Sequence, residues 1–172
     1  SKAVILQIIG KIGTAGGTGC VLEYAGSVIS NLSVEQRMTI CNMSIEGGAR
    51  AGLIQPDEKI FNYLKDRPMS PKKENWEKAL DYWSKLKSDS DAEFDKEINL
   101  KGDEIAPMVT WGTSPEDVVS INGKIPNPEN EKNIDKKNSI NRSLNYMGLK
   151  PDVKVQDIKI YKVFIGSCTN GR

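Results

Sequence analysis

The sequence predicts an α/β protein in which helices cover a sheet. Three apolar runs, at residues 3–9, 20–24 and 158–165, are typical of strands, and the first, rich in Ile and Val, is typical of a buried one. Between them, apolar residues recur at helical spacing behind capping residues, most clearly at 34–48 and 71–87. With 172 residues, the chain is long enough for one ordinary domain, or for a domain and part of another.

The first predicted strand is followed by a glycine-rich segment that leads into the second strand at 20–24. Five of the ten residues at 10–19 are glycine, yet the segment matches neither the GxGxxG nor the GxxxxGK[ST] phosphate-binding pattern. We therefore expect a close-packed structural turn rather than a nucleotide site. Glycines there allow either another backbone or a flat ligand to approach closely, and the sequence leaves both open.

A helix is predicted from residue 34 to about residue 47 or 48. Ser33 and Gln36 have the spacing of a capping box, and Glu35 lies in the first turn, where the helix dipole favours an acidic residue. Four polar residues fall on one face of this helix: Glu35, Thr39, Asn42 and Glu46. A polar stripe on a largely apolar helix indicates a surface that faces water or takes part in chemistry.

Two more helices and one weak strand are predicted in the middle of the chain. Pro56–Asp57 begins a helix that runs through Leu64. Ser70–Pro71 is an N-cap with proline at the first helical position, and it begins an amphipathic helix with Trp and Leu at helical spacing. Residues 94–100 alternate weakly, as an exposed strand does.

The last third of the chain is predicted to contain a turn, a connector, a helix and a strand. Asn122–Gly123 is typical of a hairpin turn, and 126–138 is an exposed polar connector. A helix is expected from about 140 to 147, ended by Gly148, and a strand over 158–165.

Composition excludes several functional classes. The 24 Lys and Arg residues balance 23 Asp and Glu, so the net charge is +1 and no overall field attracts nucleic acid or an anionic membrane. The longest apolar runs fall far short of the roughly 20 residues that a membrane helix needs. There is no histidine, so the chain alone cannot form a Ser-His-Asp or Cys-His catalytic group.

The three cysteines indicate an intracellular protein with reduced thiols. Cys20, Cys41 and Cys168 are an odd number, widely spaced, with no CxxC pair, and no targeting segment is visible at the start. Cys168 follows the last predicted strand and has small, polar neighbours, which suits a metal or iron–sulfur ligand. On spacing alone, a buried structural cysteine would still be favoured.

Four segments together resemble the aconitase superfamily: residues 16–26, 40–54, 109–115 and 163–172. They occur in the family's order over essentially the whole chain, and within the superfamily they are most similar to large subunits of the isopropylmalate dehydratase branch. The resemblance implies an internal fragment. The chain would then contain an aconitase-like middle domain at 1–120 and a connector at 121–157 with a polar segment and a short helix. Residues 158–172 would be the start of a truncated cluster-ligand domain.

The resemblance also implies a site. Cys168 matches the first of three cysteines that hold the family's [4Fe-4S] cluster, and the other two belong to a later CxxC that this chain does not reach. Glu46 matches the active-site glutamate that interacts with the substrate hydroxyl or with the water at the open iron. To shuttle a proton there, it would need burial that raises its pKa toward neutrality. Asn42 matches the asparagine beside the cluster.

The implied activity is the isomerisation of 2- and 3-isopropylmalate by dehydration and rehydration, in leucine biosynthesis. The base that takes the carbon proton would be a serine of a small-subunit partner in a heterodimer, or of the matching fourth domain, and the enzyme would act in the cytoplasm. The isolated chain is expected to be inactive, because it carries only one of the three cluster ligands. The alternatives are homoaconitase or another aconitase-type hydro-lyase, and a cluster-free binding module on the same fold.

Other residues are expected to have structural roles. Cys20 and Cys41 are predicted to be core thiols. Arg50 could pair with a substrate carboxylate, but an arginine just after a helix is more typical of a surface or dipole partner. The segment Trp111–Pro115 matches a family motif without a chemical role that the sequence reveals.

Overall fold

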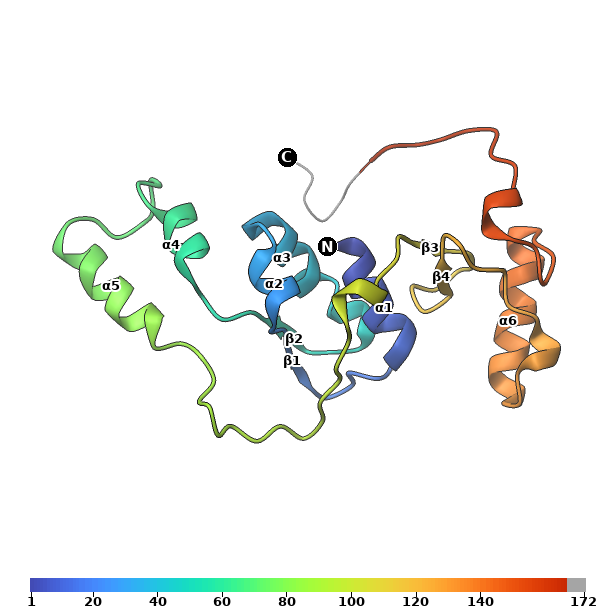
Figure 1. Cartoon of the computed structure of the whole chain (residues 1–172), viewed down its shortest axis with the longest axis horizontal. Helices are drawn as coiled ribbons and strands as arrows, with labels where there is room; N and C mark the ends of the chain where they lie inside the picture. The colour runs from blue at the N-terminus through green and yellow to red at the C-terminus, as the bar shows by residue number, and fades with distance from the viewer. Residues whose placement is uncertain (167–172) are drawn as a thin grey trace.

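The computed structural model describes residues 1–166 as a set of short helices and strands arranged along one long axis (Figure 1). The centre of the molecule contains five elements: α1 (Lys2–Ile12), β1 (Val21–Glu23), α2 (Ser27–Asn31), α3 (Val34–Asn42) and β2 (Ala51–Leu53). Helices α4 (Glu58–Leu64) and α5 (Glu74–Ser84) lie at one end and α6 (Ile134–Met147) at the other. The mixture of helices and small sheets confirms the predicted α/β class.

The central elements surround one hydrophobic core. Strands β1 and β2 pair in parallel, with Val21 opposite Ala51 and Glu23 opposite Leu53. Seven buried residues from the helices and the β1 end form this core: Ile5, Leu6, Ile9, Tyr24, Ile29, Ile40 and Met43. Helix α3 contacts both α1 and β2, so the end of α3 and the start of β2 are held against the core.

The prediction of a strand at 3–9 is wrong, because these residues form helix α1. Ile5, Leu6 and Ile9 are buried, at the i, i+1, i+4 spacing of one helical face. A short continuous apolar run fits either a strand or a buried helix, and here the helix is selected by packing against α3. The helix ends at Gly13, whose φ of 79° favours glycine.

The capping signals are confirmed at two of three helices. The Ser33–Gln36 capping box is present at α3, and the Asp57 carboxylate accepts from the backbone of the first turn of α4. Ser70 is not the cap of α5, since Lys73 occupies that position and the Ser70 hydroxyl donates to the Leu64 carbonyl instead. The α5 helix has no buried residue.

A second hydrophobic cluster lies where the antiparallel pair β3 (Met108–Thr110) and β4 (Val118–Ser120) meets α6. Its buried members are Trp111, Ile125, Ile140, Leu144 and Val155. The turn at Asn122–Gly123 exists, but the chain then forms an isolated bridge between Lys124 and Lys154, so it is not a hairpin turn.

The predicted connector at 126–138 is partly structured, because α6 begins at Ile134 rather than at about 140. The Asn133 side chain caps this helix, and Pro128 is buried in a short 3₁₀ turn before it. Polar residues that seemed typical of a connector are therefore the exposed face of the first turns. The predicted stop at Gly148 is confirmed, with a left-handed φ of 64°.

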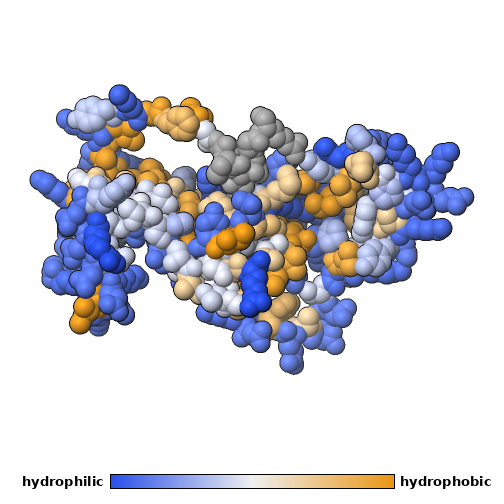
Figure 2. Space-filling view, turned by 180° about the vertical axis from the view of Figure 1, so that it is seen from behind, coloured by the Kyte–Doolittle hydropathy of each residue, from blue (hydrophilic) through white to orange (hydrophobic). Residues whose placement is uncertain are grey.

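The strands predicted at 94–100 and 158–165 are wrong for the described residues, which are irregular there. Tyr161 and Phe164 are 90% and 93% exposed. In Figure 2, hydrophobic residues of this segment, in orange, lie on the surface. A strand forms only with a partner that takes its backbone hydrogen bonds, and no strand in residues 1–166 pairs with either segment. Nor does any helix in this range combine the length and apolarity needed to cross a membrane.

Candidate active site around the Glu46 turn

Glu46 lies on a short 3₁₀ turn, Ile45–Gly47, between α3 and β2, and Asn42 is the last residue of α3. The predicted continuous helical face is therefore wrong, because the α-helix ends before it reaches Glu46. Both side chains are exposed in the described residues. They remain near each other in the sequence, but the chain between them turns instead of continuing the helix.

Buried Ser44 lies just after the end of α3 and connects the turn to its surroundings. Its hydroxyl is fully buried, donates to the carbonyl of Ile40 over 3.2 Å and lies 2.8 Å from the hydroxyl of Tyr24. Gly52 makes room for it, since a Cβ there would lie 2.2 Å from Ser44 Oγ. Burial raises the pKa of Tyr24, with the hydrogen bond to Ser44 opposing this, so the phenol stays neutral. The Glu46 turn is thus fixed to β1 and β2.

The glycine-rich segment packs directly on this turn. The Gly17 N–H donates to the carbonyl of Gly47 over 2.8 Å, and a Cβ on Gly17 would lie 3.0 Å from the same oxygen. Gly48 has φ of 84°, and a Cβ there would lie 2.7 Å from the carbonyl oxygen of Thr14. Of the two alternatives left open, close approach of a backbone is the one observed.

The same segment is poorly suited to cradle a phosphate, because its N–H groups are already used. Five residues of it donate their backbone N–H to oxygens of this chain: Gly13, Thr14, Gly16, Gly17 and Thr18. A phosphate loop needs several such groups free and convergent. The expectation of a structural turn is confirmed.

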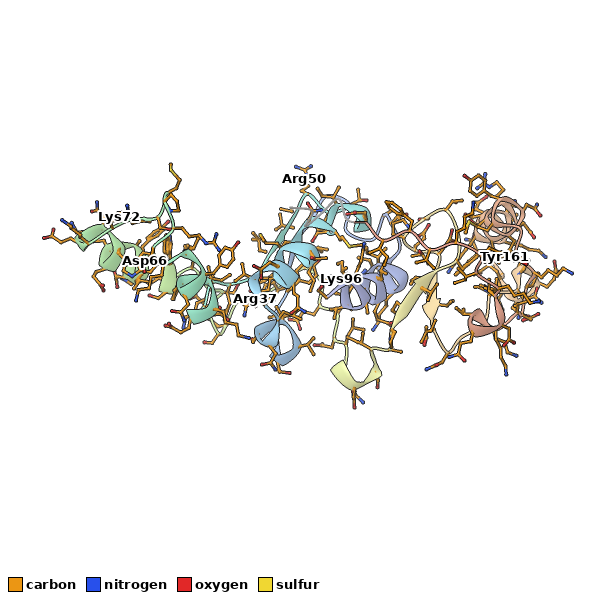
Figure 3. All side chains as sticks on the ribbon, turned by 90° about the horizontal axis from the view of Figure 1, so that it is seen from above. Arg37, Arg50, Asp66, Lys72, Lys96 and Tyr161 are labelled. Carbon is orange, nitrogen blue, oxygen red and sulfur yellow. The ribbon has the colours of Figure 1, made fainter. Side chains whose placement is uncertain are left out.

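Two opposite charges lie close in sequence at this turn and are available to a ligand. Arg50 is exposed, and Figure 3 shows it pointing away from the ribbon. Its backbone N–H donates to the carbonyl of Cys20 over 2.8 Å, which fixes its place beside β1. Within residues 1–166 neither Arg50 nor Glu46 forms an ion pair.

The described residues do not by themselves supply the ligands of an iron–sulfur cluster. Cys168 lies outside residues 1–166, and no group of three metal-ligating side chains occurs within them. Burial raises the pKa of the Cys41 thiol, which disfavours the thiolate that a cluster binds, in keeping with a packed thiol. Cys20 is exposed, so its prediction as a core thiol is wrong.

Asp117 is the residue that sequence reasoning missed, and it explains the Trp111–Pro115 motif. Its buried carboxylate accepts from the backbone N–H of Thr113 and Ser114 and from the Ser143 hydroxyl, at 3.1, 3.3 and 2.8 Å. A Cβ on Gly112 would lie 2.2 Å from that carboxylate. The motif therefore forms a rigid connection between β3 and β4. Ser114 followed three residues later by Asp117 was the available local signal.

One comparison with known proteins bears on this arrangement. The model of the aconitase family (aconitate hydratase) matches residues 1–172.

Proposed function

Because the chain belongs to the aconitase family, whose members are iron–sulfur hydro-lyases, we propose that it is part of the large subunit of an enzyme that isomerises 2- and 3-isopropylmalate. The reaction removes water from one isomer and returns it to the alkene at the neighbouring carbon. The choice of substrate is supported by the similarity of residues 16–26, 40–54, 109–115 and 163–172 to the isopropylmalate dehydratase branch.

The observation that carries the proposal is the Glu46 carboxylate, which has no ion-pair partner within residues 1–166 and lies on a turn held from two sides. Gly17 and buried Ser44 fix the backbone of the turn while the carboxyl group remains available. Such a group can hold a proton and pass it to or from a substrate hydroxyl. Because Glu46 is exposed in residues 1–166, the surface that closes over it would come from elsewhere in the assembled enzyme.

Asn42 and Cys168 have supporting roles in this proposal. The Asn42 amide, at the end of α3, would donate or accept a hydrogen bond next to the cofactor. Cys168 would hold one corner of a [4Fe-4S] cluster by its thiolate, with two further thiolates supplied outside this sequence. When bound, the cluster supplies a Lewis acid that makes the substrate hydroxyl a better leaving group.

A partner completes the site in this proposal. The base for the carbon proton would be a serine of the small subunit, and the two subunits would work as a heterodimer in the cytoplasm. Arg50, exposed and unpaired within residues 1–166, is available to a carboxylate of the substrate.

The test is Glu46→Gln in the complete enzyme, assayed with its small subunit. We expect kcat to fall by about 10²- to 10⁴-fold with little change in KM, because one proton donor is removed from the transition state. Glu97→Gln is the matched control, since Glu97 is exposed on an irregular segment. Unchanged turnover in Glu46→Gln would remove Glu46 from the mechanism.

A substrate panel decides between the proposal and its alternatives. The proposal expects turnover of isopropylmalate in preference to homocitrate- or citrate-type substrates. A preference for the homocitrate type would identify a homoaconitase, and absence of turnover with any of them would favour a cluster-free binding module.

A further inference from the structure

We propose that Glu116 is a positioning residue that fixes the Glu46 turn through the glycine-rich segment. The inference rests on the proposed function for its catalytic consequence, because it concerns the placement of the same carboxyl group. Its structural part, a mechanical link between the β3–β4 connection and the turn after α3, can be measured independently.

The first contact joins Glu116 to the glycine-rich segment. The backbone N–H of Thr14 donates to Glu116 Oε2 over 3.0 Å, between residues 102 positions apart in the sequence. A Cβ on Gly13 would lie 3.2 Å from the same oxygen. The carboxylate therefore lies against the backbone of Gly13 and Thr14, and it accepts from an N–H group just beyond the end of α1.

The second contact joins the glycine-rich segment to the Glu46 turn. The Thr14 carbonyl oxygen lies so close to Gly48 that a Cβ there would be 2.7 Å away. Three positions further along the segment, Gly17 donates to the Gly47 carbonyl. Thr14 thus contacts Glu116 by its N–H and the turn by its carbonyl. A displacement of Thr14 would be felt at Gly48, two residues from Glu46.

The third observation is that the backbone carrying Glu116 is held by contacts of both following residues. Its neighbour Asp117 is buried and accepts three hydrogen bonds, including that from Ser143 on α6. On the other side, Val118 of β4 packs on α1 so closely that a Cβ on Gly10 would lie 2.5 Å from its side chain. Glu116 therefore extends an exposed side chain from a segment of backbone that is held in place, and it can connect the two loops.

Loss of the contact between Glu116 and Thr14 should lower the rate of the reaction. Proton transfer is sensitive to placement, and a shift of about 1 Å can cost about 100-fold in rate. Loss of one exposed hydrogen bond loosens the turn without unfolding it, so the expected fall in kcat is smaller, about threefold to tenfold, with KM within about twofold.

The experiment compares Glu116→Ala, Glu116→Asp and Glu116→Gln in the complete, cluster-loaded heterodimer. Hydrogen–deuterium exchange of residues 13–19 and 44–50 is measured together with kcat and KM. In Glu116→Ala we expect exchange about fivefold faster in both segments, as loss of one net hydrogen bond allows. Glu116→Gln keeps an acceptor oxygen and should restore slow exchange and most of kcat. Glu97→Ala is the control and should change neither.

Glu116→Asp keeps the experiment informative if the alanine variant misfolds. It retains the negative charge and shortens the side chain by one methylene, which moves the acceptor oxygen away from the Thr14 N–H. Faster exchange in Glu116→Asp supports the link. Unchanged exchange at 44–50 in the alanine and aspartate variants, or a glutamine variant that behaves like alanine, overturns it. If exchange responds as expected but Glu46→Gln retains full turnover, the link stands and the proposed function fails.

Discussion

Replacing Asp57 should destabilise the protein more than any exposed substitution, because its partner Arg37 is a buried cation. Arg37 is 3% exposed, and its guanidinium donates to both Asp57 oxygens at 2.9 and 2.6 Å and to the carbonyl of Ser30 at 3.0 Å. Its Nε is buried and has no partner in the described residues. In Asp57→Asn the cation would lose the charge that compensates its burial.

The magnitude follows from the two roles of Asp57. Breaking a buried ion pair from one side costs about 3–5 kcal/mol. Since the Asp57 side chain is 33% exposed, water reaches the pair and the expected loss in Asp57→Asn is nearer ~2 kcal/mol. Asp57 also caps α4 by accepting from Lys59 and Ile60, and an asparagine can keep that cap. Asp57→Ala removes it as well, which adds about 1 kcal/mol.

Urea unfolding of the three proteins, followed by circular dichroism, measures these free energies. The Arg37 guanidinium lowers the pKa of Asp57, chiefly by hydrogen bonding, below its ordinary value of 3.8. The stability from this pair is therefore present above pH 3.8 and is lost as the pH falls through the lowered value. The wild type and Asp57→Asn should converge in acid. A difference below about 0.5 kcal/mol at neutral pH would refute the reasoning.

Three further outcomes are expected. Gly52→Ala should destabilise the protein by about 2 kcal/mol or more in thermal melting, because the new Cβ would collide with Ser44 Oγ. The control Gly148→Ala has open space around the new Cβ and should cost only the strain of the positive φ. Tyr24→Phe should cost about 1 kcal/mol, independent of pH up to the ordinary pKa of tyrosine, since it loses one buried hydrogen bond. Cys168→Ser in the complete enzyme should abolish stoichiometric [4Fe-4S] absorbance, and the isolated 172-residue chain should show neither that absorbance nor turnover.

Features with a local physical cause were predictable from the sequence. The Ser33 capping box, the Asp57 cap and the Gly148 stop each depend on a side chain or a φ angle within four residues of the helix end. The second strand at 20–24 was also predicted, and β1 occupies Val21–Glu23. At the three helix ends, the residue that signals the structure also makes the contact.

Features decided by distant contacts were not predictable. Residues 3–9 became a helix because α3 offers a surface for one of its faces, and 158–165 has no partner strand among the described residues. The polar face from Asn42 to Glu46 was interrupted by Ser44, whose burial depends on Gly52 in the next strand. The contact of Glu116 with Thr14 spans 102 positions and leaves no mark in local periodicity.

The placement of tryptophan gives the molecule a natural optical label at each end. Trp76 and Trp83 are half-buried on α5, where Trp83 stacks on Phe61 of α4 and meets Trp76 edge-on. Trp111 is 4% exposed and lies in the hydrophobic cluster beside α6. These are all the tryptophans of the chain. Acrylamide should quench the emission of Trp76 and Trp83 and spare Trp111, so that fluorescence reports the two ends of the molecule separately.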